Sequence, residues 1–167
     1  MELSVIIPVH NEEHCISSLC KELEGVLSIL KKEYEVIFID DGSYERTAEK
    51  ISRICKIDKN IKLVSFTRRF GLSAALAAGF EVATGETVVS MDGDLQNDPK
   101  DMGMLLTELY KGYDIVCGYR KKRHDALLSR RLSSFVANRV GMFIFGLSIH
   151  DFSTTYRELT EEMLCKI

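Results

Sequence analysis

The sequence predicts an α/β fold with a mostly parallel, Rossmann-like sheet flanked by helices. Two observations support this fold class. Short apolar runs rich in β-branched residues alternate with segments of helical periodicity from the start of the chain, which is typical of a parallel sheet. The chain has 167 residues and is 46% hydrophobic, enough for one α/β core but short for two domains. Strands are expected over residues 3–9, 35–39, 61–66, 87–91 and 114–117.

Helices are expected between these strands. Apolar residues recur at helical spacing after the first strand, and Asn11 is the predicted N-cap of this helix. A second helix is expected to start at Ser43, a third to cover 71–84, and a fourth to begin near Asp98, where Pro99 suits the first turn. In the third helix, the residues expected to face the sheet are Leu72, Ala75, Leu76, Gly79, Phe80 and Ala83.

Charge and cysteine content narrow the class of protein. With 22 basic and 25 acidic residues the net charge is −3, so no global field attracts nucleic acid or an anionic membrane, and phosphate recognition must be local. The five cysteines lack the paired spacing of a zinc or redox site, which favours free thiols in a reducing compartment. The chain enters its first strand without a leader pattern, so a cytoplasmic protein is expected.

Two carboxylates separated by one glycine follow the fourth predicted strand. In extended backbone, residues two apart point to the same side, so Asp92, Asp94 and Gln96 are expected to offer oxygen ligands to one cation. Gly93 lets the chain turn closely around it. Mg²⁺ favours one or two protein carboxylates completed by phosphate oxygens and water. An exposed acidic turn is the alternative that an isolated Asp-x-Asp pattern leaves open.

A second acidic pair, Asp40 and Asp41, ends the second predicted strand. Both acidic strand ends should therefore lie at the carboxyl edge of the sheet, where ligands bind in open α/β folds. Converging carboxylates repel one another unless a cation or hydrogen-bond donors are present, and a base or ribose offers such donors. The alternative is a helix N-cap by Ser43 beside a solvated acidic pair. Residues from Pro8 to Glu12 add amide and carboxylate groups at the same edge.

Together these residues resemble the family-2 glycosyltransferases with a GT-A type fold. The form Asp-Gly-Asp-Leu-Gln is most similar to the branch that uses polyprenyl phosphates, including dolichyl-phosphate mannose synthases and bacterial undecaprenyl-phosphate glycosyltransferases. The stretch 151–157 is similar to that branch too, so the resemblance covers nearly the whole chain. The motifs that carry it are Ile7-Pro8-Val9-His10-Asn11-Glu12, Asp40-Asp41-Gly42-Ser43, Thr67-Arg68-Arg69-Phe70-Gly71, Met91-Asp92-Gly93-Asp94-Leu95-Gln96-Asn97-Asp98-Pro99 and Gly118-Tyr119-Arg120.

The resemblance implies a hexosyltransferase that moves a sugar from a UDP- or GDP-sugar to an acceptor, a polyprenyl phosphate, with Mg²⁺ or Mn²⁺. It implies nucleotide contacts by Pro8, His10, Asn11, Glu12, Asp40, Asp41, Arg68 and Asp92. It implies metal binding by Asp92, Asp94 and Gln96. The implied donor- or acceptor-phosphate ligands are Arg120, Arg130, Arg131 and Arg157, because guanidinium groups bind phosphate in a bidentate fork. The implied catalytic residues are Asp94, Arg120 and Asp151.

Some of these roles have alternatives. Arg130 and Arg131 also fit a solvated basic face or contact with anionic headgroups, and Asp151 fits a structural pair with Arg157. An acceptor phosphate is already ionised near neutral pH, so a strong general base is not required. The amphipathic stretch 132–149 fits either a membrane interface or burial against the sheet.

The expected organisation is one domain over 1–167, with a nucleotide-sugar half at 1–118 and a partial acceptor-side half at 119–167. Because the chain stops at Ile167, its C-terminal part is expected to be truncated, which leaves the activity of this segment alone open. Arg69 stands where the branch usually has asparagine. The expected location is the cytoplasm, at the cytoplasmic face of a membrane, and a homo-oligomer fits. The base, the sugar and the acceptor are not determined.

Three other classes of protein share some of these features. A signalling receiver domain also carries acidic strand ends, but its acidic pair follows the first strand and not the second. A sugar nucleotidyltransferase would open with a glycine-rich phosphate loop, which Pro8-Val9-His10-Asn11 is not. A non-catalytic nucleotide-binding fragment stays open as the main alternative to an enzyme.

Overall fold

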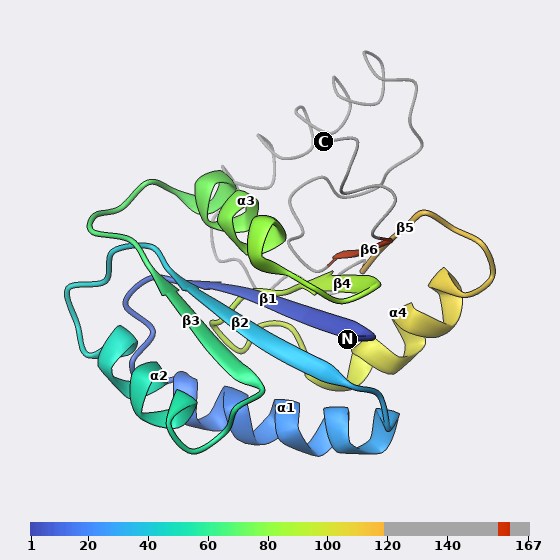
Figure 1. Ribbon diagram of the computed structural model, residues 1–167, viewed down its shortest axis with the longest axis horizontal. Coiled ribbons are helices and arrows are strands. Elements are labelled where there is room, and N and C mark those ends of the chain that lie inside the picture. The colour runs from blue at the N-terminus through green and yellow to red at the C-terminus, as the bar shows by residue number, and fades with distance from the viewer. Residues whose placement is uncertain (119–156, 161–167) are drawn as a thin grey trace, which may run out of the picture.

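The computed structural model describes residues 1–118 and 157–160, and its sheet and helices alternate along the chain (Figure 1). The strands are β1 (Leu3–Val9), β2 (Tyr34–Asp40), β3 (Ile61–Ser65), β4 (Thr87–Ser90), β5 (Ile115–Cys117) and β6 (Arg157–Thr160). The helices are α1 (Ile16–Leu30), α2 (Thr47–Cys55), α3 (Leu72–Val82) and α4 (Met102–Leu109), the last preceded by a 3₁₀ turn at Pro99–Asp101.

The described strands form one six-stranded sheet in the order β3-β2-β1-β4-β6-β5. Strands β1 to β4 are mutually parallel, with Val5 opposite both Val36 and Val89. Strand β6 runs antiparallel to β4 and to β5. The sheet is therefore mostly parallel, as predicted, and the antiparallel β6 is the element that the sequence did not predict.

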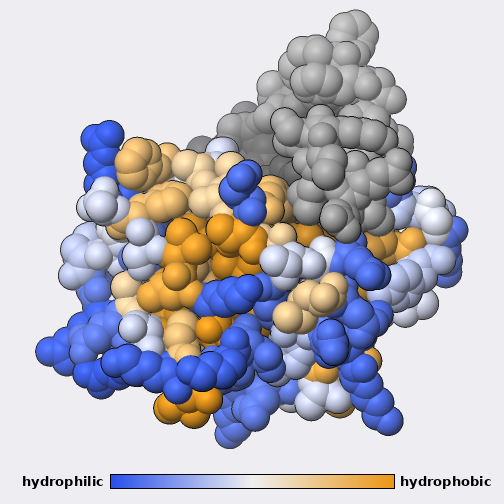
Figure 2. Space-filling model, in the orientation of Figure 1, coloured by the Kyte–Doolittle hydropathy of each residue, from blue (hydrophilic) through white to orange (hydrophobic). Residues whose placement is uncertain are grey.

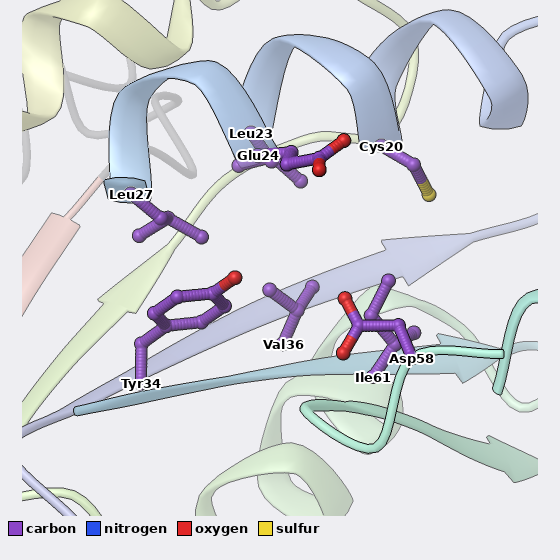
Figure 3. Close-up of a pocket in the computed structure, with 8 residues that line it drawn as sticks. All are labelled: Cys20, Leu23, Glu24, Leu27, Tyr34, Val36, Asp58 and Ile61. Atoms are coloured by element: carbon purple, nitrogen blue, oxygen red, sulfur yellow. The ribbon is translucent and has the colours of Figure 1, made fainter. Parts of the chain in front are cut away.

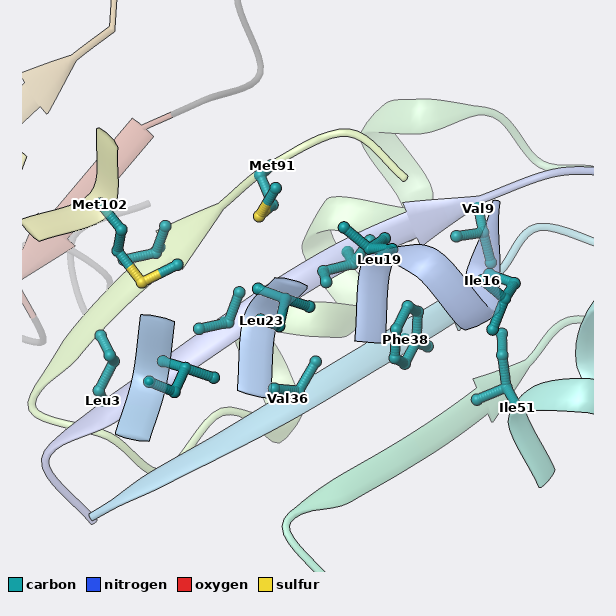
Figure 4. Close-up of a cluster of buried hydrophobic side chains, with 14 of the residues drawn as sticks. Leu3, Val9, Ile16, Leu19, Leu23, Val36, Phe38, Ile51, Met91 and Met102 are labelled. Atoms are coloured by element: carbon teal, nitrogen blue, oxygen red, sulfur yellow. The ribbon is translucent and has the colours of Figure 1, made fainter. Parts of the chain in front are cut away.

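Helices cover both faces of this sheet. On one face, α1, α2 and α4 pack on the apolar side chains of β1 and β2, and this larger cluster includes Leu19, Phe38 and Met102 (Figure 4). On the other face, α3 packs against Ile6, Ile37 and Val88 (Figure 1). In β1, β2 and β4 nearly every residue is buried, on both faces, which explains why these strands read as largely apolar runs and not as alternating ones.

The expected helix starts at Asn11 and Ser43 are wrong. Helix α1 begins at Ile16, with Cys15 as the residue before it, and α2 begins at Thr47. Asn11 has a φ of 59° and lies in the preceding loop, so it cannot continue into a helix. The fourth start is confirmed, because Asp98 accepts a hydrogen bond from Lys100 N (3.0 Å) at the 3₁₀ turn before α4.

The expected inner face of the third helix is partly confirmed. Ala75 and Gly79 are buried, and Leu76, Phe80 and Ala83 pack against the same cluster. Leu72 is 48% exposed, so its assignment to the sheet-facing side is wrong. It is the first residue of α3, where the helix has only just begun to run over the sheet.

The surface in the view of Figure 1 divides into two zones. Hydrophobic residues gather in the middle of this face, and hydrophilic ones lie along its lower side, where α1 and α2 run (Figure 2). Among the described residues, no helix is both long and apolar enough to cross a membrane.

Candidate functional site

The ends of the four parallel strands meet at one edge of the sheet. Asp41 N donates to Val9 O (2.9 Å), and Phe66 N donates to Asp40 O (2.9 Å), so the chain leaves β1, β2 and β3 side by side. Met91 N donates to Ile6 O (3.1 Å), which brings the exit of β4 to the same edge. The predicted convergence of the acidic strand ends is confirmed, and the loops after β1 to β4 form the candidate site.

The loops after β1 and β2 are joined by the Asn11 residue. Asn11 N donates to Ser43 Oγ (2.9 Å), and Asn11 Oδ1 accepts from Tyr44 N (3.1 Å). These bonds require the left-handed backbone at Asn11, a conformation that asparagine tolerates better than most residues. Asn11 and Ser43 therefore bind each other across the loops, which is why neither begins a helix.

The neighbours of Asn11 repeat this pattern. His10 Nδ1 lies 2.9 Å from Asp41 O, and Glu12 N donates to Thr47 Oγ1 (3.0 Å). Thr47 is fully buried at the start of α2, so it ties the β1 loop to that helix. The predicted nucleotide residues His10 and Glu12 are thus fixed through backbone and ring contacts to the next loop. The Tyr44 ring stands edge-on to His10, with 6.1 Å between centroids.

Both carboxylates of the acidic pair are buried and hydrogen-bonded. The Asp41 side chain is 7% exposed, and its Oδ1 accepts from Phe70 N (2.6 Å) and Gly71 N (3.1 Å). The Asp40 Oδ1 atom accepts from Ser43 N (3.3 Å) and from the Ser43 hydroxyl. Asp41 therefore anchors the loop after β3, and Asp40 anchors the turn after β2. The solvated acidic pair that served as the alternative is wrong.

The loop after β3 packs directly on Gly42. This glycine has a φ of +66°, and an added Cβ would lie 2.3 Å from the backbone carbon of Arg68. Arg68 itself is exposed and stacks its guanidinium 4.9 Å from the Phe70 ring centroid. Arg69 Nε lies 3.8 Å from Asp41 Oδ2. The residue that departs from the family pattern thus places a positive charge beside the buried carboxylate.

The loop after β4 carries the predicted metal ligands. Gly93 is packed so tightly that an added Cβ would lie 2.6 Å from Val9 Cγ1, which presses this loop against the end of β1. Asp94 Oδ1 accepts from Gln96 N (3.0 Å), and Leu95 has a φ of +61°. The loop is therefore turned and not extended. The extended backbone on which the prediction for this loop was based is therefore wrong, and the metal roles of Asp92, Asp94 and Gln96 stay predictions.

Cys15 shows that the loops after β1 and β4 approach each other. Burial raises the pKa of the Cys15 thiol, and a hydrogen bond to Glu12 together with the charges of Glu12 and Asp94 raises it further. Two carboxylates from different loops therefore lie near one thiol. This gathers negative charge on the side of the site that faces the β4 loop.

The charge and ligand types in this loop fit a hard divalent cation. No group of three or more histidine, cysteine or acidic side chains that could hold a metal occurs among residues 1–118. The predicted ligands Asp92 and Asp94 are two carboxylates, the number at which Mg²⁺ sites are usually completed by substrate phosphates and water. Because Gly93 leaves no room for a side chain against Val9, the two carboxylates are brought close to the end of β1.

Of the remaining predicted site residues, Arg157 is placed by its backbone, next to β4. The backbone of Arg157 is opposite both Ser90 and Cys117 in the sheet, so Arg157 starts β6 at the edge where the candidate site lies. Arg120, Arg130, Arg131, Asp151 and the amphipathic stretch 132–149 fall outside the described residues. Their assignments stay predictions.

Comparison with known proteins shows the family to which this chain belongs. The glycosyl transferase family 2 model matches residues 4–165. The chain belongs to glycosyl transferase family 2. The predicted resemblance to the polyprenyl-phosphate branch is also confirmed, since curated relatives of the chain are polyprenyl-phosphate sugar transferases.

Two curated relatives of this family-2 chain illustrate the branch. The dodecaprenyl-phosphate galacturonate synthase of Rhizobium johnstonii is 33% identical over 159 residues, covering 94% of this chain and 47% of the relative. The undecaprenyl-phosphate 4-deoxy-4-formamido-L-arabinose transferase of Pseudomonas fluorescens is 33% identical over 156 residues, covering 93% and 46%. The chain therefore spans about half the length of the curated relatives that it matches.

Solved structures confirm the GT-A type fold. A mannosyltransferase of Pyrobaculum calidifontis, in complex with GDP-Man and Mn²⁺, aligns with a TM-score of 0.65 at 20% identity, over 99% of this chain and 46% of that one. The glucosyl-3-phosphoglycerate synthase of Mycobacterium tuberculosis, in complex with Mn²⁺, UDP and phosphoglyceric acid, aligns with a TM-score of 0.66 at 24% identity, over 97% and 56%.

Sequence reasoning missed several residues that build the site. Thr47, Tyr44 and Asn97 were given no role, although Thr47 and Asn97 are buried polar residues and Tyr44 contacts His10. Their nearness in the sequence to the acidic motifs could have pointed to them. Tyr44 and Thr47 follow the acidic pair, and Asn97 follows the Asp-x-Asp pattern. The partners of Tyr44 and Thr47 lie in the loop after β1 and cannot be read from spacing, and Asn97 contacts Asp92 within its own loop because that loop turns.

A pocket at the opposite edge of the sheet does not compete with this site. It lies between α1 and the amino ends of β2 and β3, with Leu23, Tyr34 and Ile61 among its lining residues (Figure 3). Its volume of about 230 Å³, open solvent included, is below the usual range for ligand pockets. Two of its lining groups, Glu24 and Asp58, are acidic, which disfavours a phosphate-bearing ligand.

Proposed function

We propose that the protein containing this chain transfers a sugar from a UDP- or GDP-sugar to a polyprenyl phosphate, with Mg²⁺ or Mn²⁺ as cofactor. The observation that carries the proposal is the meeting of the acidic loop after β4 with the interlocked loops after β1, β2 and β3 at one sheet edge. Family membership and the activities of the two curated relatives support the reaction class.

The nucleoside end of the donor is assigned to the loops after β1 to β3. In the sheet order β3-β2-β1-β4, the metal ligands follow β4, so a diphosphate bound there leaves the base over β1, β2 and β3. Pro8, His10, Asn11 and Glu12 line this side with Arg68, and the acidic pair Asp40 and Asp41 holds the loops in shape. Asp92 joins the nucleotide contacts and the metal ligands.

Asp92 and Asp94 are the residues that would hold the cation, with Gln96 as a third oxygen donor. When bound, the cation would neutralise the charge that develops on the nucleoside diphosphate as it leaves the anomeric carbon. The chain itself orients the donor by its fixed loops, which lowers the entropy cost of reaching the reactive geometry. Because an acceptor phosphate is ionised near neutral pH, the chain needs no strong base to deprotonate it.

The acceptor side is assigned to the region beyond β4. The backbone of Arg157 begins β6 next to the end of β4, and we assign this residue to a phosphate of donor or acceptor because guanidinium groups favour such ligands. Arg120, Arg130 and Arg131 are assigned the same class of contact, and Asp151 assists a hydroxyl acceptor if one is used. We further propose that the protein acts at the cytoplasmic face of a membrane, where its 119–167 half reaches the lipid phosphate. We also propose that it assembles as a homo-oligomer.

Calorimetric titration of UDP and GDP into the purified chain, with and without Mn²⁺ or Mg²⁺, tests the proposal. We expect one nucleotide to bind more tightly with metal, and the metal-dependent gain to disappear in Asp94→Ala. Asp114→Ala is the matched control, because Asp114 is exposed at the amino end of β5. If a folded chain binds neither nucleotide under any condition, the proposed donor site is wrong.

A transfer assay then separates an enzyme from a nucleotide-binding fragment. The protein is incubated with UDP- or GDP-sugars and undecaprenyl phosphate in detergent, and release of the nucleoside diphosphate is followed. Acceptor-dependent release identifies a glycosyltransferase. Binding of nucleotide and metal without release, by a protein with the length of its relatives, would favour a binding function instead.

A further inference from the structure

Asn97 is a buried polar residue beside the proposed metal ligands and has no role in the proposed donor site. It is 5% exposed, whereas its neighbours Leu95 and Gln96 are exposed. Its amide nitrogen Nδ2 donates a hydrogen bond to Asp92 Oδ2 (3.3 Å). A carboxamide can donate in this way and a carboxylate cannot, so the residue type matters to the contact.

Asn97 also links Asp92 to a rigid part of the fold. The next two residues form the start of the 3₁₀ turn, where the Asp98 side chain accepts from Lys100 N (3.0 Å) and Pro99 is buried. That turn leads into α4, whose Met102 belongs to the main core cluster. The amide that contacts Asp92 is therefore held by packed helix and not by the exposed tip of the loop.

The geometry of the loop shows why such support is needed. Gly93 is fixed against Val9, and Asn97 is buried four residues later. Between them, Asp94 accepts a bond from the backbone of Gln96, and Leu95 holds a φ of +61°, which is strained for this side chain. The two buried residues thus bracket the strained turn, which carries Asp94 and directly follows Asp92.

We infer that Asn97 is a positioning residue that holds the Asp92 carboxylate in the orientation in which it binds the divalent cation of the donor complex. The inference rests on the proposed function. A hydrogen bond to one oxygen of a ligating carboxylate fixes the carboxylate plane, and loss of such an outer contact typically weakens metal binding by about 10- to 100-fold.

Two variants test this inference. Asn97→Asp keeps the shape of the side chain but removes the donor and sets a second negative charge beside Asp92. Asn97→Ser is neutral but too short to reach across the contact. Asn60→Asp is the matched control, because Asn60 is exposed in the turn before β3.

The measurements are the Kd of Mn²⁺ with saturating UDP or GDP, by calorimetry and by the spin-resonance signal of free Mn²⁺, together with metal-free nucleotide affinity and melting temperature. We expect the Kd of Mn²⁺ to rise about 10- to 100-fold in Asn97→Asp and about 10-fold in Asn97→Ser. Metal-free nucleotide affinity should stay within about twofold, because Asn97 follows β4 whereas the loops assigned to the nucleoside follow β1, β2 and β3.

The outcomes separate this inference from the proposed function. If the wild-type chain binds Mn²⁺ with nucleotide and both variants bind it equally well, Asn97 is not a positioning residue, while the proposed function stands. If both variants lose metal-free nucleotide binding or melt far below the wild type, Asn97 has a general structural role and the inference is overturned. A wild-type chain that binds no nucleotide overturns both.

Discussion

The loops after β1, β2 and β3 are joined by hydrogen bonds from loop to loop, whereas two short-range side-chain bonds shape the turn in the loop after β4. Asn11 binds Ser43 and Tyr44, and Asp41 binds the backbone of Phe70 and Gly71, each across 29 residues or more. In the β4 loop, Asp94 binds Gln96, two residues away, and Asn97 binds Asp92, five residues away. The two halves of one site are therefore built differently.

This difference predicts how each half of the site would bind the donor. Cross-loop bonds fix the nucleoside side before any ligand arrives, which reduces the ordering cost of binding there. The proposed metal side carries a strained residue, Leu95, directly after the two carboxylates Asp92 and Asp94, whose mutual repulsion a bound cation would relieve. We therefore expect stability changes from mutations on the nucleoside side and metal-affinity changes from mutations on the metal side.

The largest effect is expected at the junction of the nucleoside loops. Gly42→Ala places a Cβ 2.3 Å from the backbone of Arg68 at a φ of +66°, so the two loops must separate. We expect the free energy of unfolding to fall by about 3 kcal/mol or more, measured by urea denaturation. Gly25→Ala is the control. It lies in α1 with nothing within 4 Å of the added Cβ and should stabilise the chain by about 1 kcal/mol. Equal losses in both would contradict the interlocking.

The next largest effect is expected at Glu35, a buried carboxylate at the opposite edge of the sheet. Because Glu35 lies outside the candidate site, the comparison of the two halves applies to the site alone. Burial alone would raise the pKa of Glu35, but Lys62, Ser4 and Thr84 outweigh it and lower the pKa from 4.5 to about 2. The Ser4 hydroxyl and Thr84 N donate to Oε1 at 2.6 and 2.7 Å, and Lys62 Nζ lies 2.5 Å from Oε2. Because the folded pKa is depressed, this stabilisation is present above pH 4.5 and is lost as the pH falls toward 2.

Glu35→Gln tests this pH dependence. We expect the variant to lose about 2 kcal/mol at pH 7, a value reduced because Lys62 is half exposed. The wild type should lose that advantage between pH 4.5 and 2, followed by urea denaturation at each pH. Glu33→Gln, at an exposed position, is the control. A stability difference that does not change across this pH range would show that the Glu35 charge is not the cause.

A smaller effect is expected on the metal side. Gly93→Ala sets a Cβ 2.6 Å from Val9 Cγ1, a contact that a side-chain shift can relieve in part. We expect about 1 kcal/mol of lost stability and about a tenfold rise in the Kd of Mn²⁺ with nucleotide. Gly103→Ala in α4 is the control, since its added Cβ would meet only Leu30 Cδ2, at 3.7 Å. Unchanged Mn²⁺ affinity in Gly93→Ala would mean that the β4 loop tolerates displacement from β1.

The smallest effect is expected at Tyr44. Its ring is 85% exposed and touches His10 edge-on, while His10 is also held by the Asp41 carbonyl. We expect Tyr44→Ala to change stability by less than about 0.5 kcal/mol and nucleotide affinity by about twofold to fivefold, measured by calorimetry beside Tyr113→Ala. A loss well beyond tenfold would show that the Tyr44 ring itself covers the base, so that the nucleoside side is completed by an exposed residue.

The strands could be predicted because a strand that is buried on both faces appears in the sequence as a nearly continuous apolar run. The runs that form β1, β2 and β4 are mostly apolar and almost entirely buried, and their bounds match the prediction closely. The parallel order then followed from the helices between them. Strand β6 was missed because Arg157–Thr160 is polar and short, so its pairing is set by the neighbouring strands and not by its own pattern.

The site could be predicted as a meeting of strand ends but not in its local geometry. Asn11 and Ser43 were assigned to helix starts because their residue types favour N-caps, whereas the structure uses them to bind each other. The turn at Leu95 could not be predicted, since nothing about leucine signals a positive φ. Contacts between residues 29 or more positions apart are set by tertiary packing, which local spacing does not encode.

The place of β6 in the sheet has a consequence for synthesis of the chain. Strand β4, which leads into the proposed metal ligands, pairs on its outer side with residues 157–160, made about 70 residues later, and such distant pairings form slowly. Until then β4 presents an open strand edge that can pair with another chain. A nascent protein released before residues 157–160 are made would contain the complete loops after β1, β2 and β3. Its strand β4 would still have one unpaired edge, a form that chaperones must shield from aggregation.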